Sequence, residues 1–89
     1  MVRIFYSLDM ARAVRRLPLP VKNLQMDIVG LPNTLAIRVY EEDIMQYNET
    51  KRMEIMEYLV TVQKLIESYG VPCLIDGVRY DPNNPRKVR

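Results

Sequence analysis

Residues 49–69 constrain the fold most strongly, because their apolar side chains recur at the spacing of one long amphipathic helix. A helix with such a stripe must bury it against another element. Asn48 or Thr50 can cap its start, and Gly70 can supply the left-handed residue that closes its end. The stripe consists of Ile55, Leu59, Val62, Ile66 and Tyr69, flanked by Met56, Val60 and Leu65. At about 1.5 Å per residue this helix spans roughly 30 Å, and we expect the rest of the chain to pack against it.

Several other stretches have the alternation or the apolar content of β-strands. Residues 24–29 and 34–40 alternate on either side of Gly30-Leu31-Pro32-Asn33, a sequence typical of a turn. They therefore predict an antiparallel hairpin. The remaining predicted strands are residues 2–6, 71–75 and 78–80, the last two joined by a tight turn at Asp76-Gly77.

Two shorter helical segments complete the predicted elements. Ser7 or Asp9 can cap a helix that runs to Leu17, where Pro18 and Pro20 stop it. A second segment, residues 43–47, is expected to be separated from the long helix by a break near Asn48.

The order strand, helix, strand, strand, helix, strand predicts an α+β fold of the ferredoxin-like split βαββαβ kind. In that arrangement an antiparallel four-stranded sheet carries both helices on one face. The alternative is another small α+β sheet in which the long helix lies across a hairpin pair. Residues 1–80 are interpreted as a single domain, and residues 81–89 as a flexible basic tail.

The composition argues against several kinds of chemistry. The chain has 89 residues, no histidine, one cysteine and three widely separated glycines, so the usual general base, a thiolate metal cluster and a glycine-rich phosphate loop are missing. We therefore expect no enzyme activity, cofactor or metal. The single thiol, Cys73, is interpreted as an inert core residue and indicates a reducing, intracellular location, cytoplasmic or nuclear. No apolar run approaches the length of a membrane span, so no membrane association is expected.

One predicted constellation lies on the sheet face that the helices leave uncovered. If Leu35, Ile37 and Val39 face the helices, the opposite face of the two central strands presents Arg3, Phe5, Arg38 and Tyr40. Together with the strand order, this aromatic pair resembles the RNA-recognition motif family, whose sheet aromatics stack on bases. The stretch Arg3-Ile4-Phe5-Tyr6-Ser7-Leu8 resembles the first-strand motif of that family, whereas residues 33–40 lack the basic-glycine-aromatic opening of its third strand. The resemblance implies an RRM-like fold that binds single-stranded RNA.

The leading hypothesis is instead a non-catalytic protein-interaction module that self-associates or docks on a larger partner. Methionine and tyrosine are adaptable or amphipathic and are enriched at partner surfaces. The candidate interface residues are Phe5, Tyr40, Met53, Met56 and Tyr58. Two alternatives stay open: Phe5 and Tyr40 can form a cross-strand pair, and the two methionines can pack under the first helix. A regulatory, ligand-sensing domain is a third class, and it requires a pocket.

Overall fold

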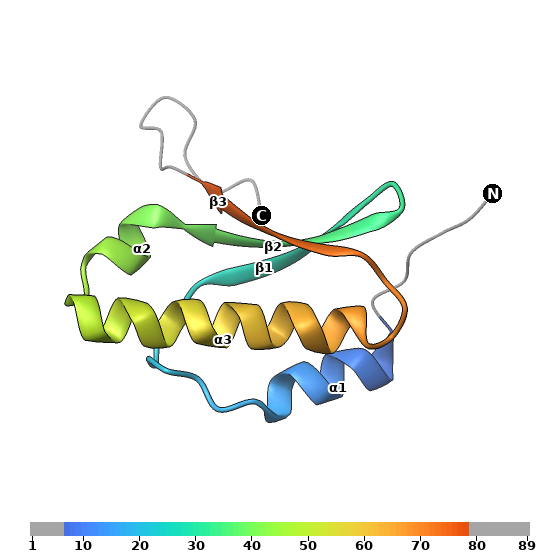
Figure 1. Cartoon of the computed structure of the whole chain (residues 1–89), viewed down its shortest axis with the longest axis horizontal. Helices are drawn as coiled ribbons and strands as arrows, with labels where there is room; N and C mark the ends of the chain where they lie inside the picture. Colours follow the sequence, from blue (N-terminus) through green and yellow to red (C-terminus); the bar gives the residue numbers. More distant parts are fainter. Residues whose placement is uncertain (1–6, 79–89) are drawn as a thin grey trace.

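The computed structural model of the chain describes residues 7–78, which form a small α+β domain (Figure 1). Three helices and three strands follow one another along this part of the chain in the order α-β-β-α-α-β. The elements are α1 (Leu8–Arg16), β1 (Met26–Leu31), β2 (Thr34–Tyr40), α2 (Glu41–Met45), α3 (Glu49–Glu67) and β3 (Cys73–Val78). The predicted strand at residues 2–6 and the predicted tail at residues 81–89 lie outside the described residues.

The sheet is mixed, with the order β1-β2-β3. β1 and β2 form the predicted antiparallel hairpin, while β2 and β3 run parallel, with Leu35 opposite Cys73 and Ile37 opposite Ile75. The prediction of an antiparallel sheet is therefore wrong, because the chain crosses over through α3 and returns beside β2 in the same direction. Both edges of β2 are occupied, by β1 and β3, so the central position predicted for a first strand is already filled. The full βαββαβ order of the ferredoxin-like fold is not shown.

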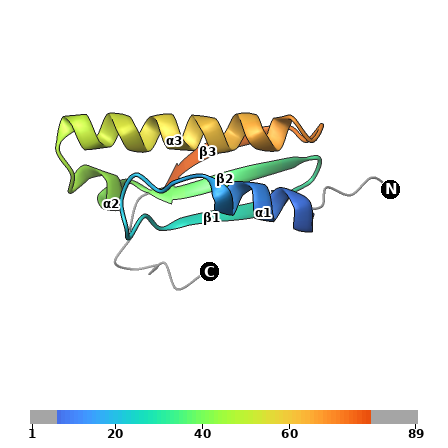
Figure 2. The ribbon, with the colours of Figure 1, turned by 90° about the horizontal axis from the view of Figure 1, so that it is seen from below.

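The hydrophobic core lies between the sheet and the two longer helices, α1 and α3, which pack on the same side of it (Figures 1 and 2). β2 contributes Leu35, Ile37 and Val39, as the alternation predicts. The central residues of α3 that face them, Ile55 and Leu59, are completely buried. α1 adds Met10 and Val14. Helix position and sheet register thus agree on which side chains of β2 face the helices.

The ends of α3 confirm the sequence prediction. The Asn48 side chain caps the helix, since its Oδ1 accepts a hydrogen bond from the Lys51 backbone N–H at 2.8 Å. Beyond the last helical residue, Gly70 has a φ of 82° and its N–H donates to the Glu67 carbonyl at 2.9 Å. A left-handed φ suits glycine, which has no Cβ to clash with the preceding turn. The break near Asn48 is also present, because α2 ends at Met45.

The tight turn predicted at Asp76-Gly77 is wrong, because both residues lie inside β3. Pairing with β2 overrides the local preference: Asp76 lies opposite Arg38, and Gly77 lies opposite Val39. The Arg38 Nε lies 3.4 Å from the Asp76 Oδ2 and links the two strands through an ion pair. The strand predicted to return at residues 78–80 is therefore replaced, over its described part, by the end of β3.

Candidate interaction surfaces

The two sides of α3 differ sharply in exposure. Ile55 and Leu59 on the inner side are completely buried, whereas Met53 and Met56 on the outer side are 62% and 45% exposed. Figure 2 shows α3 along the upper edge of the molecule, with no other labelled element beyond it. The two methionines therefore do not pack under α1, which was one of the alternatives. They form an outward apolar surface on an otherwise charged helix.

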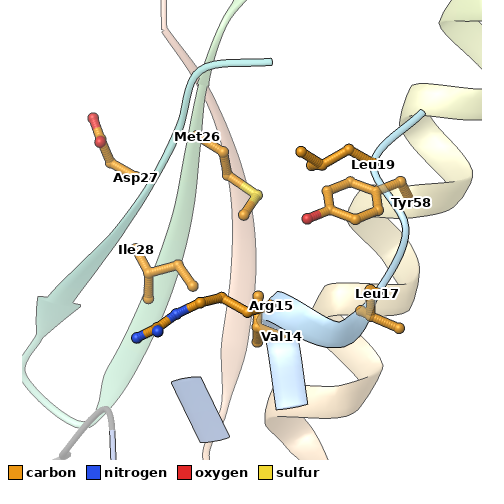
Figure 3. A pocket seen from close by; sticks show the side chains of 8 residues that line it. All are labelled: Val14, Arg15, Leu17, Leu19, Met26, Asp27, Ile28 and Tyr58. Carbon is orange, nitrogen blue, oxygen red and sulfur yellow. The ribbon is translucent and has the colours of Figure 1, made fainter. Parts of the chain in front are cut away.

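Tyr58 does not share this outer surface, although the sequence grouped it with the two methionines. Its side chain is 8% exposed and belongs to the core. Helical spacing explains the difference, because Tyr58 follows the buried Ile55 by three residues and faces the segment after α1 (Figure 3). The outer surface instead includes Val60, which is half-buried, and lies near the exposed Met45 of α2.

Sequence reasoning assigned Val60 to the edge of the core stripe and left Met45 out. The signal for Val60 is present: Glu49, Met53, Met56 and Val60 follow one another at spacings of four, three and four residues. That is a second helical stripe, beside the one that forms the core. Met45 carries no such signal, because its place next to α3 depends on the bend between the two helices.

Arg52 lies at the rim of the outer surface and has an incomplete hydrogen-bond set. Its Nη1 approaches the Met45 Sδ at 3.5 Å, while its Nε is buried from water and has no hydrogen-bond partner among the described residues. A buried donor without a partner is unfavourable by roughly 1–3 kcal/mol. Arg52, Met53 and Met56 line a shallow groove together with Glu49 and Glu57. The groove thus combines apolar side chains with one unsatisfied cation.

The other face of the sheet holds the remaining described residues of the predicted RNA site. Arg38 and Tyr40 lie there, opposite in direction to the core residues of β2. Tyr40 is only 2% exposed, so its ring offers little area for stacking on a base. Arg38 is paired with Asp76, and Asp27 lies opposite it in the register of β1. Arg3 and Phe5 lie outside the described residues.

A hollow of about 390 Å³ separates the end of α1 and the following segment from β1 (Figure 3). Its walls are mostly apolar, with Leu19, Met26 and Tyr58 gathered on one side, and the Arg15 side chain crosses it near Ile28. Asp27 belongs to the same rim, but its carboxylate points away from the other labelled side chains. Ligand sites combine an apolar lining with convergent polar groups, and here the labelled polar groups directed at the hollow are the Arg15 guanidinium and the Tyr58 hydroxyl.

The described residues offer little reactive chemistry. Burial raises the pKa of the Cys73 thiol, and the nearby Glu67 carboxylate raises it further. A raised pKa lowers the thiolate fraction at neutral pH, which agrees with an inert core thiol. Within residues 7–78, no three His, Cys, Asp or Glu side chains are grouped so that they could hold a metal ion. No helix in that range has the length and apolar character needed to cross a membrane.

Comparison with known proteins gives no relative: no family model, no curated protein and no solved structure matches this chain.

Proposed function

We propose that this chain is a non-catalytic protein-interaction module that self-associates through the outer face of α3. The observation that carries the proposal is the exposure of Met53 and Met56 on a helix whose opposite side is fully buried. Exposed apolar patches that are rimmed by charge are typical of protein–protein contact sites. Methionine suits such a site because its flexible, polarizable side chain adapts to a partner.

The neighbouring charges support a protein partner. Glu49, Arg52 and Glu57 border the two methionines, so the groove has an apolar centre and a charged rim. This is the usual anatomy of a protein interface, in which the centre excludes water and the rim stays polar. An RNA site would require an excess of positive charge, and the groove has two carboxylates and one guanidinium.

The side chains on the outer sheet face support RNA binding less than the sequence pattern suggests. Arg38 is compensated by Asp76, and Tyr40 is buried. A cation that already forms an ion pair must give up that pair to contact a phosphate, and a buried ring has no face to offer a base. These observations weigh in favour of the protein-interaction proposal.

Sedimentation velocity at increasing protein concentration tests the proposal. The wild-type chain is expected to shift reversibly from monomer to dimer between micromolar and millimolar concentration, whereas Met53→Glu stays monomeric. The control is Lys22→Glu, which introduces a carboxylate at an exposed residue outside the outer face of α3. A wild-type chain that remains a monomer throughout would refute self-association, and equal association of the wild type and Met53→Glu would refute the role of α3.

A further inference from the structure

We infer that the partner on the outer face of α3 is a second copy of the same helix, which packs antiparallel to the first about a two-fold axis near Val60. This inference depends on the self-association proposed above and specifies its geometry. It follows from the placement of the charged residues that flank the outer stripe, as well as from the exposed methionines.

The outer stripe has two flanks that carry different charges. Glu57 and Lys64, both exposed, lie two helical turns apart on one flank. Arg52 lies on the other flank, one turn before Met56, and Glu67 continues the stripe at its far end. Three of these charged side chains form no ion pair with the described residues: Glu57, Lys64 and Glu67. These groups are available to a partner.

The charges are arranged symmetrically about Val60 with opposite signs. Glu57 lies three residues before Val60 and Lys64 lies four after it. Arg52 lies eight residues before it, and Glu67 lies seven after it. In an antiparallel two-fold pair, each flank of one helix meets the same flank of the other in reverse order. Glu57 then lies opposite the Lys64 of the second copy, and Arg52 lies opposite its Glu67, so the pair contains each contact twice.

A parallel pair has the opposite consequence. Its two-fold axis runs along the helices, so residues at the centre of the stripe meet their own copies, and Glu49 lies against Glu49 and Glu67 against Glu67. Each flank meets the opposite flank, so Glu57 lies near Arg52 of the second copy. Like charges brought together at the centre of a partly desolvated interface are repulsive. The antiparallel pair also gives the Arg52 guanidinium, which forms no ion pair with the described residues, an anionic neighbour. It further places the methionines of both copies around the two Val60 side chains, which covers the apolar centre.

The segments that pack beside α3 leave its outer stripe accessible. On one side, the Gln63 Nε2 donates to the Cys73 carbonyl at 2.8 Å, so β3 closes against the inner part of the helix. On the opposite side, the segment after α1 reaches Glu54, Tyr58 and Thr61, and Glu57 lies where this contact meets the outer groove. Between these two contacts the stripe from Met53 to Lys64 faces outward, so a further helix can lie along it.

Charge reversal with complementation tests the geometry. Glu57→Lys and Lys64→Glu are each expected to weaken homodimerisation about tenfold, because every dimer loses two attractive pairs and gains two repulsive ones. An equimolar mixture of the two variants should form a heterodimer, and the double variant Glu57→Lys/Lys64→Glu should recover the wild-type dissociation constant within about threefold. Lys22→Glu, which makes the same charge change as Lys64→Glu at an exposed residue outside α3, is the matched control.

The outcomes separate this inference from the proposed function. If the wild-type chain dimerises but the mixture and the double variant do not recover association, the antiparallel geometry is wrong while self-association stands. A parallel pair predicts that Glu57→Lys weakens the dimer while Lys64→Glu does not, and that the double variant is as weak as Glu57→Lys. A wild-type chain that never associates refutes both statements. Circular dichroism of each variant checks that the chain remains folded, since all the altered side chains are exposed.

Discussion

The two sides of α3 are expected to respond in opposite ways to the same kind of truncation. Leu59 is completely buried, so Leu59→Ala removes core contacts and leaves a cavity. Such truncations destabilise by about 2–5 kcal/mol, a large share of the roughly 5–10 kcal/mol that holds a domain of this size together. Met56 is 45% exposed. Met56→Ala therefore removes fewer contacts, and we expect it to change the free energy of unfolding of the monomer by less than about 1 kcal/mol.

The effects of the two truncations on dimerisation should follow the reverse order. Full burial of a methionine side chain contributes about 2 kcal/mol, so covering the exposed 45% of Met56 contributes about 1 kcal/mol in each copy. The two copies together give about 2 kcal/mol, which corresponds to a roughly thirtyfold weaker dimer for Met56→Ala. Leu59→Ala should leave the dissociation constant of the folded fraction close to that of the wild type, because Leu59 does not reach the outer face.

Urea denaturation at low protein concentration measures the free energy of unfolding of the monomer. Sedimentation equilibrium at a temperature where both variants are folded measures the dissociation constant of the dimer. The denaturation midpoint should fall for Leu59→Ala with little change in the slope. If Met56→Ala proves as destabilising as Leu59→Ala, Met56 is a core residue and the outer surface does not exist. If Leu59→Ala weakens the dimer more than Met56→Ala does, the interface lies elsewhere.

Three further predictions concern the cap, the thiol and the sheet. Asn48→Ala should destabilise the chain by about 1 kcal/mol in thermal unfolding, while Thr50→Ala two residues later should have less effect; an equal effect would contradict the assignment of the cap. Because the pKa of the Cys73 thiol is raised in the folded state, its contribution to stability is full below the ordinary thiol pKa and is lost as the pH rises through the raised value. Urea midpoints should therefore fall above about pH 9 in the wild type and fall less in Cys73→Ala. Arg38→Ala should leave any binding of single-stranded RNA unchanged, as measured by fluorescence anisotropy, since Arg38 already pairs with Asp76. A clear loss of binding would favour the RNA function.

Local features of the sequence predicted much of the fold. The helical spacing and caps of α3, the turn around Asn33 and the inward residues of β2 are all read from neighbours within a few positions. Asn33 has a φ of 63°, a left-handed conformation that asparagine tolerates better than most residues. Such signals are set by short-range sterics and by one-sided burial, so they survive in the folded chain.

The errors share one cause, which is pairing between distant segments. Asp76-Gly77 favours a turn when read alone, and only the parallel partner β2 holds it extended. The choice of which edge of the hairpin receives the last strand depends on the path of α3, and no local pattern encodes that path. The position of Tyr58 was misassigned for a related reason: two helical stripes lie side by side on α3, and the sequence does not say which residues lie in each. Burial in the assembled domain decides that.

The parallel pairing of β2 with β3 has a consequence for the order in which the chain folds. The hairpin of β1 and β2 needs only neighbouring residues and can form early, whereas β3 arrives after about thirty intervening residues have closed a long loop. During synthesis the edge of β2 that later pairs with β3 therefore stays exposed while α2 and α3 are still being made. An uncovered strand edge accepts any extended segment with the right side chains, including the β3 of a neighbouring nascent chain. The inward-facing residues of α3 are all synthesised before β3. Rapid packing of α3 against the hairpin therefore positions the crossover early and shortens the time during which the edge of β2 is exposed.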